Sequence, residues 1–279
     1  MRDFCLLRFS IRSALLLLSA LCCAGCGDRV IPPVAPQPWV SSLTLVDQST
    51  NVNMVQGYAS GTSLDGTPLN FFFSNSLLYS SSTYDSLTPV AVNQNLLPPK
   101  TNHLGAGDYY DGHVYGVIEN WQGCDQSSAP IFVSIFDAAT LQQESTVEIT
   151  AWIPEASGIA IIPGTGQALV SSFCDPNHLY LFSTADWSFT GTVPLQIPVS
   201  GNQGVSYRDG FVYIAGTNGA LYGLHLADNS MRLLMQSPVS GEFEGLDFHG
   251  PQLRWLVNRS DGPHILYSYA PVYAAASTP

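Results

Sequence analysis

Apolar and polar residues alternate along residues 202–226, NQGVSYRDGFVYIAGTNGALYGLHL, in three short runs separated by Asp-Gly and Asn-Gly. Alternation with a period of two predicts half-buried strands, and those two dipeptides are favoured in tight hairpin turns. The segment is therefore predicted to form a three-stranded meander.

The same pattern recurs along the chain. Five segments begin with a glycine, continue through a turn into a second apolar run, and usually add a third strand and a weaker fourth, as in STVEIT. The leading glycines are spaced by 48, 53, 46 and 41 residues and are Gly57, Gly105, Gly158, Gly204 and Gly245. Four antiparallel strands repeated every 40–50 residues are typical of β-propeller blades.

We therefore predict an all-β protein, a β-propeller with five blades. Six blades are the alternative if residues 71–99 contain another blade, and a β-sandwich is the alternative fold, although it would not show this period. The last repeat has room for only three strands before the Ala/Ser/Pro-rich end. Residues 39–47, WVSSLTLVD, alternate like a strand without a blade of their own, so we expect this N-terminal strand to complete the last blade and close the ring.

The first residues are typical of a bacterial export signal. Three arginines precede a short apolar run, and the signal ends in Cys23-Ala24-Gly25-Cys26, which resembles a lipobox except for Cys23. A lipid-modified Cys26 is expected, with ordinary signal cleavage or a single membrane-spanning anchor as alternatives. The predicted organisation is a signal peptide, a proline-rich tether, the propeller and a tail, over residues 1–25, 26–38, 39–271 and 272–279.

This leader predicts a location in the bacterial cell envelope, attached to the membrane through the lipid, or else a periplasmic or extracellular protein. The outer membrane is favoured because Gly27, rather than aspartate, follows Cys26. The net charge of -12 excludes a nucleic-acid surface, since phosphate contacts need clustered positive charge. Once the leader is removed, Cys124 and Cys174 are left as an even pair, for which a disulfide is predicted in an exported domain.

The residues next to the leading glycines are expected to meet at one mouth of the propeller channel. The candidate ligand-binding residues are Gln56, His103, Ser157, Asn202, Gln203 and Glu244. Glu244 is also the candidate catalytic residue, with three roles left open: a general base, a cation ligand, or neither. The alternative is a purely structural polar ring that holds water. No cofactor or metal is expected, because the phosphate-loop, Gly-x-Ser-x-Gly and His-Glu-x-x-His motifs are missing from the sequence.

The blade openings VQGYA, HLGAGDY, ASGIAI, NQGVSY and FEGLDF resemble those of the five-bladed plant-type glutaminyl cyclases. EFEGLDF also resembles openings in phytase-like and lactonase-like propellers. The resemblance implies a five-bladed fold with a site at the channel. The catalytic motif is not matched, because Ala106 stands where the cyclases carry an acid and Ser157 where they carry a tryptophan.

Together these features predict an exported binding or scaffold module for a protein, peptide or glycan ligand. The alternative is a propeller hydrolase or cyclase whose site lies at the channel mouth. The sequence leaves open which of the two is correct, and the identity of the ligand.

Overall fold

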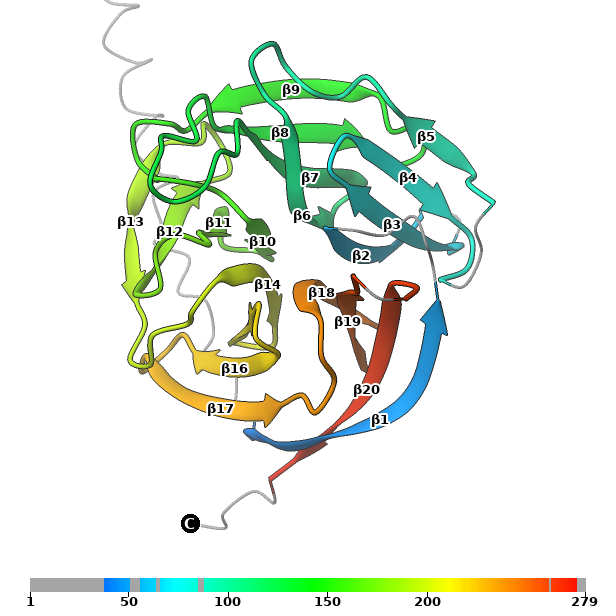
Figure 1. Cartoon of the computed structure of the whole chain (residues 1–279). Helices are drawn as coiled ribbons and strands as arrows, with labels where there is room; N and C mark the ends of the chain where they lie inside the picture. Colours follow the sequence, from blue (N-terminus) through cyan, green and yellow to red (C-terminus); the bar gives the residue numbers. More distant parts are fainter. Residues whose placement is uncertain (1–37, 51–55, 64–65, 85–87, 261, 275–279) are drawn as a thin grey trace, which may run out of the picture. The chain divides into compact units, whose positions relative to one another are not determined.

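Five four-stranded antiparallel sheets are arranged radially around a central axis in the computed structural model (Figure 1). The structure describes residues 38–50, 56–63, 66–84, 88–260 and 262–274. In this part of the chain no helix is long and apolar enough to cross a membrane. The predicted leader, tether and Cys26 lie outside the described residues.

Each of the first four blades is a meander of four consecutive strands, from the axis outwards. Blade one contains β2 (Gly57–Thr62), β3 (Pro68–Ser74), β4 (Leu77–Ser81) and β5 (Ala91–Asn93). Blade two contains β6 (His103–Tyr110), β7 (His113–Glu119), β8 (Phe132–Asp137) and β9 (Gln143–Glu148). Blade three contains β10 (Gly158–Ile162), β11 (Gln167–Ser171), β12 (His178–Ser183) and β13 (Phe189–Pro194). Blade four contains β14 (Asn202–Arg208), β15 (Phe211–Gly216), β16 (Ala220–His225) and β17 (Ser230–Gln236).

Blade five joins the two ends of the propeller. It contains β18 (Glu242–His249), β19 (Gln252–Asn258), β20 (Ile265–Tyr273) and, outermost, β1 (Val40–Thr50). β1 pairs antiparallel with β20, from Val40 opposite Tyr273 to Thr50 opposite Ile265. The predicted ring closure by an N-terminal strand is confirmed. The five-blade prediction is also confirmed, because the described residues between 71 and 99 belong to blade one.

Apolar side chains fill the spaces between adjacent blades. Phe71 of blade one stacks on Tyr109 of blade two with ring centroids 5.6 Å apart, and Tyr213 of blade four meets Phe248 of blade five at 4.7 Å. The middle strands are almost wholly buried, whereas the outer strand β9 is exposed at every position except the half-buried Val147. Burial therefore follows the radial stacking of the sheets, and no blade could bury its apolar faces alone.

The leading glycines allow the inner strands to meet at the axis. A Cβ atom added to Gly204 would lie 2.8 Å from the Cα of Gly245, and one added to Gly245 would lie 2.9 Å from the Cα of Gly57. A Cβ on Gly158 would lie 3.0 Å from the Cα of Gly204, and one on Gly105 would lie 2.6 Å from the Ser157 carbonyl oxygen. Any side chain at these positions would meet the backbone of the next blade.

We predict that Gly245→Ala destabilises the propeller by about 1–3 kcal/mol, because the added methyl group overpacks the axis. The measurement is the free energy of unfolding in denaturant. Gly262→Ala is the matched control, since the nearest atom to its added Cβ is 3.6 Å away on the Arg259 side chain. Equal stability of the two variants would show that the inner strands can separate without loss.

Candidate functional site

A cavity of about 340 Å³ lies where the inner strands begin and the second strands of several blades end. Its lining is mainly polar, with the aromatic side chains of a tryptophan and a phenylalanine and with two carboxyl groups. It is formed by Gln56, Asn75, His103, Trp121, Glu155, Phe173, Gln203, Glu242 and Asn258. Pockets of this size hold small molecules.

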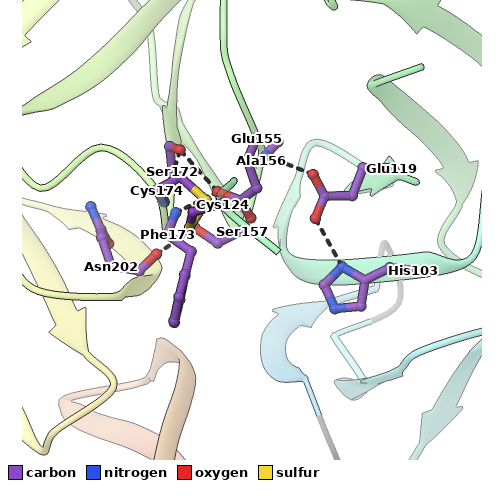
Figure 2. The surroundings of a disulfide bond; sticks show 10 residues. All are labelled: His103, Glu119, Cys124, Glu155, Ala156, Ser157, Ser172, Phe173, Cys174 and Asn202. Atoms are coloured by element: carbon purple, nitrogen blue, oxygen red, sulfur yellow. Dashed lines mark hydrogen bonds and ion pairs between the residues drawn. A yellow bond between two sulfur atoms is a disulfide. The ribbon is translucent and has the colours of Figure 1, made fainter. Parts of the chain in front are cut away.

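A disulfide joins two of the loops around this cavity, and its surroundings are shown in Figure 2. Cys124 follows β7 and Cys174 follows β11, so the bond links blades two and three. The predicted disulfide is confirmed. Trp121 and Phe173, from the same two loops, meet edge to face with centroids 5.6 Å apart, and both line the cavity. The bond closes a separation of 50 residues, which is worth about 4 kcal/mol by loop entropy.

His103 and Glu119 form a hydrogen-bonded pair beside the cavity. They begin β6 and end β7, and the register of these strands places them opposite each other. Nδ1 of His103 lies 3.2 Å from Oε1 of Glu119, whose Oε2 accepts a hydrogen bond of 3.1 Å from the Ala156 N–H (Figure 2). Burial lowers the pKa of His103, although the charges of Glu155 and Glu242 act in the opposite direction.

Glu155 is the second buried acid of this group, and it faces the cavity from the loop before β10. One of its oxygens accepts hydrogen bonds from the Ser172 hydroxyl, at 2.9 Å, and from the Phe173 N–H. Burial and then the neighbouring charge of Glu119 raise the pKa of Glu155 to about 8. Burial likewise raises the pKa of Glu119 to about 7, opposed by hydrogen bonds that include one with Glu155. The two carboxyl groups therefore hold a proton between them near neutral pH.

Glu244, the candidate catalytic residue, is buried next to the cavity and does not line it. Neither of its carboxyl oxygens has a hydrogen-bond partner of normal geometry among the described residues. Burial raises its pKa well above the usual value, the charge of Glu242 adds to this shift, and the contact with Asn258 opposes it. Burial therefore favours the neutral form of Glu244. Its role as the catalytic residue stays a prediction.

Three of the six predicted ligand-binding residues line the cavity: Gln56, His103 and Gln203. Ser157 is buried and donates to the Asn202 carbonyl, or shares a hydrogen bond of 3.0 Å with Ser171. The side chain of Asn202 is fully buried, and both of its amide atoms lack partners in the described part of the chain. Some of the predicted residues therefore line the cavity, and the others are buried beside it.

Sequence reasoning missed Glu119 and Glu155. Glu119 ends the apolar run HVYGVIE, where an acid after buried positions is unexpected, and this was its available signal. Glu155 lies in the irregular segment IPEAS, for which no pattern indicates a direction. Within the described residues, no group of three or more His, Cys, Asp or Glu side chains has an arrangement that could hold a metal ion.

No protein-family model matches the sequence, and no curated protein sequence matches it. Solved structures do resemble the fold. The glutaminyl cyclase of Myxococcus xanthus superposes with a TM-score of 0.60 and 11% identity, over 84% of this chain and 98% of that chain. A luciferin-regenerating enzyme superposes with a TM-score of 0.55 and 11% identity, over 80% of each chain. At this identity the likeness establishes a β-propeller fold shared with enzymes.

We predict that the Glu119–Glu155 pair makes the protein less stable as the pH rises. Both folded-state pKa values, about 7 and about 8, lie above the usual glutamate value of 4.5. The protonated pair therefore contributes fully below about pH 4.5, and its contribution is lost as the pH rises through 7 to 8.

The measurement is the free energy of unfolding between pH 5 and 9 for the wild type and Glu155→Gln. The free energy of unfolding of Glu155→Gln should fall less steeply with rising pH than that of the wild type. Glu148→Gln, an exposed substitution on β9, should show the same pH dependence as the wild type. A slope identical in all three proteins would contradict a raised pKa at Glu155.

Proposed function

We propose that the protein is a binding module whose channel-mouth cavity takes a small ligand carrying a free amino group, such as the amino terminus of a peptide. The observation that carries this proposal is the charge of the lining. Glu242 contributes a carboxylate, and Glu155 and the buried Glu119 behind it share one proton and so keep one negative charge between them. No lysine or arginine is found among the described residues that line the cavity. A cationic ligand is therefore favoured and an anionic one disfavoured.

The rest of the lining supports a ligand with hydrogen-bond donors and an apolar part. The amide of Gln56 donates to Asn75 at 2.9 Å and that of Gln203 donates to Glu242 at 3.2 Å, so these side chains are already oriented. Trp121 and Phe173 provide an aromatic wall against which an apolar group or a cation can pack. The net charge of -12 would also attract cations at long range.

The cellular setting of this proposal comes from the sequence. A lipid on Cys26 would hold the propeller at the envelope surface, with residues 26–38 as the tether. Presentation at a surface suits a module that captures peptides. This anchoring stays a prediction.

We predict that phenylalaninamide binds the protein and that N-acetylphenylalaninamide binds at least about 10-fold more weakly, because acetylation removes the positive charge. Isothermal titration calorimetry at neutral pH and low salt measures both. Glu242→Gln should weaken phenylalaninamide binding by about 10-fold, since it removes a carboxylate without changing the shape of the cavity.

Glu148→Gln, remote on β9, is the matched control and should bind like the wild type. Equal affinity for the acetylated and free amines would overturn the cationic ligand. Failure of both compounds to bind at millimolar concentration would overturn the proposed function itself.

A further inference from the structure

The cavity contains a base and an acid whose protonation states suit catalysis at neutral pH. His103 and Glu155 both line it, on blade two and on the loop into blade three. Glu119 lies behind them, fully buried; it is hydrogen bonded to His103, and its charge acts on Glu155. Binding of an amino group would not require a base and an acid arranged in this way.

The position of Glu119 fixes the orientation of His103. Its Oε1 is 3.2 Å from Nδ1, and the Ala156 N–H holds its other oxygen, so Glu119 cannot turn away. With the ring proton on Nδ1, the lone pair lies on Nε2, the nitrogen that points away from Glu119 in Figure 2. Burial keeps the imidazole neutral at pH 7, so Nε2 is available as a base.

Glu155 has the opposite character. Its carboxyl group is almost completely buried, and the nearby carboxylate of Glu119 disfavours a second negative charge. It therefore keeps its proton at pH 7, while the Ser172 hydroxyl and the Phe173 N–H hold one of its oxygens. Two titratable groups whose environments push their pKa values apart, facing one cavity, are the arrangement that acid–base catalysis needs.

We propose that His103 and Glu155 are the general base and general acid of a hydrolytic reaction on the bound ligand, and that Glu119 is their positioning residue. This inference rests on the proposed function, because the amino group held by the cavity places the scissile bond. The substrate class is an ester or amide of an amino acid, with its amino group free.

The step balances with water as the co-reactant. His103 Nε2 takes a proton from water as the water oxygen bonds to the carbonyl carbon. The bond from that carbon to the leaving oxygen or nitrogen breaks, and Glu155 gives its proton to the leaving group. After the products leave, His103 Nε2 releases its proton to water and Glu155 takes up a proton from water, which restores the starting state. Glu119 holds the Nδ1 proton side of the ring throughout.

The charged groups around these residues set the pH dependence. Glu119, Glu155 and Glu242 face His103, and Glu119, His103 and Tyr180 are close to Glu155. Activity requires neutral His103 and protonated Glu155. The pH profile of kcat/KM should therefore be a bell, with its acidic limb at the His103 pKa, below 6.5, and its basic limb near pH 8.

The test is hydrolysis of phenylalanine methyl ester and phenylalaninamide, followed by release of phenylalanine. His103→Asn and Glu155→Gln should each lower kcat by at least about 100-fold. Glu119→Gln should lower kcat and displace the acidic limb of the profile, a change that a merely structural role would not produce. His113→Gln, at the opposite end of β7 from Glu119, and Glu148→Gln should retain wild-type rates.

Binding of each compound is measured in parallel, with thermal unfolding of each variant as a check of folding. Compounds that bind the wild type but are hydrolysed no faster than by His103→Asn would overturn the catalytic inference and leave the binding function standing. Compounds that do not bind would overturn both. If Glu119→Gln does not fold, the His103→Asn and Glu155→Gln rates still decide the inference.

Discussion

The close approach of the inner strands at the axis is the constraint on which the rest of the structure depends. Three of the leading glycines, Gly57, Gly204 and Gly245, lie so close that a Cβ on Gly204 or Gly245 would come within 3 Å of a neighbouring Cα. Hydrogen bonds between blades reinforce this contact: Ala106 N–H donates to the Ser157 carbonyl at 2.8 Å, and Gly245 N–H donates to the Gln56 carbonyl at 3.1 Å. The residues before these glycines are held by the same contacts: Gln56 and Gln203 line the cavity at one mouth, and Glu244 is buried beside it.

Three acidic side chains are buried close to that mouth. Glu119, Glu155 and Glu244 are each almost fully buried, and burial is the largest cause of the raised pKa of all three. Burying a carboxyl group away from a cation destabilises the folded state once it ionises. A chain selected for stability alone would place apolar residues there. Buried groups that lower the stability of the folded state are typical of functional sites.

The fold could be predicted from the sequence because its determinants are local and repeated. The turn dipeptides, the alternation and the glycine spacing each report a property of one blade, and the unpaired run at 39–47 indicated how the ring closes. The site could be predicted only where it follows the same repeat, as for Gln56, His103 and Gln203. Glu119 belongs to the site through its register opposite His103, and Glu155 through an irregular loop, and neither relation is visible in a single sequence.

Glu244 shows a second reason why the site could not be fully predicted from the sequence. The pairing of β18 with β19 is irregular between Phe243 and Leu246, so the alternation that assigns side chains to faces is interrupted at Glu244 itself. Similar irregularities occur in β6 between Leu104 and Gly107, and in β14 between Asn202 and Gly204. The backbone departs from regular pleating at the positions where the strands meet the axis. An alternation with a period of two therefore does not predict on which face of the sheet these side chains lie.

The chemistry of the mouth also does not follow from the likeness of the fold. Where the glutaminyl cyclase motif has its acid, this chain has Ala106, which is packed at the axis against Gly57 and Gly245. The buried acids come instead from the end of β7 and from the loop before β10. A propeller brings the starts of its inner strands and the ends of its second strands to the same mouth, so either set can supply the reacting groups. A fold shared at 11% identity therefore does not determine which groups act in a site.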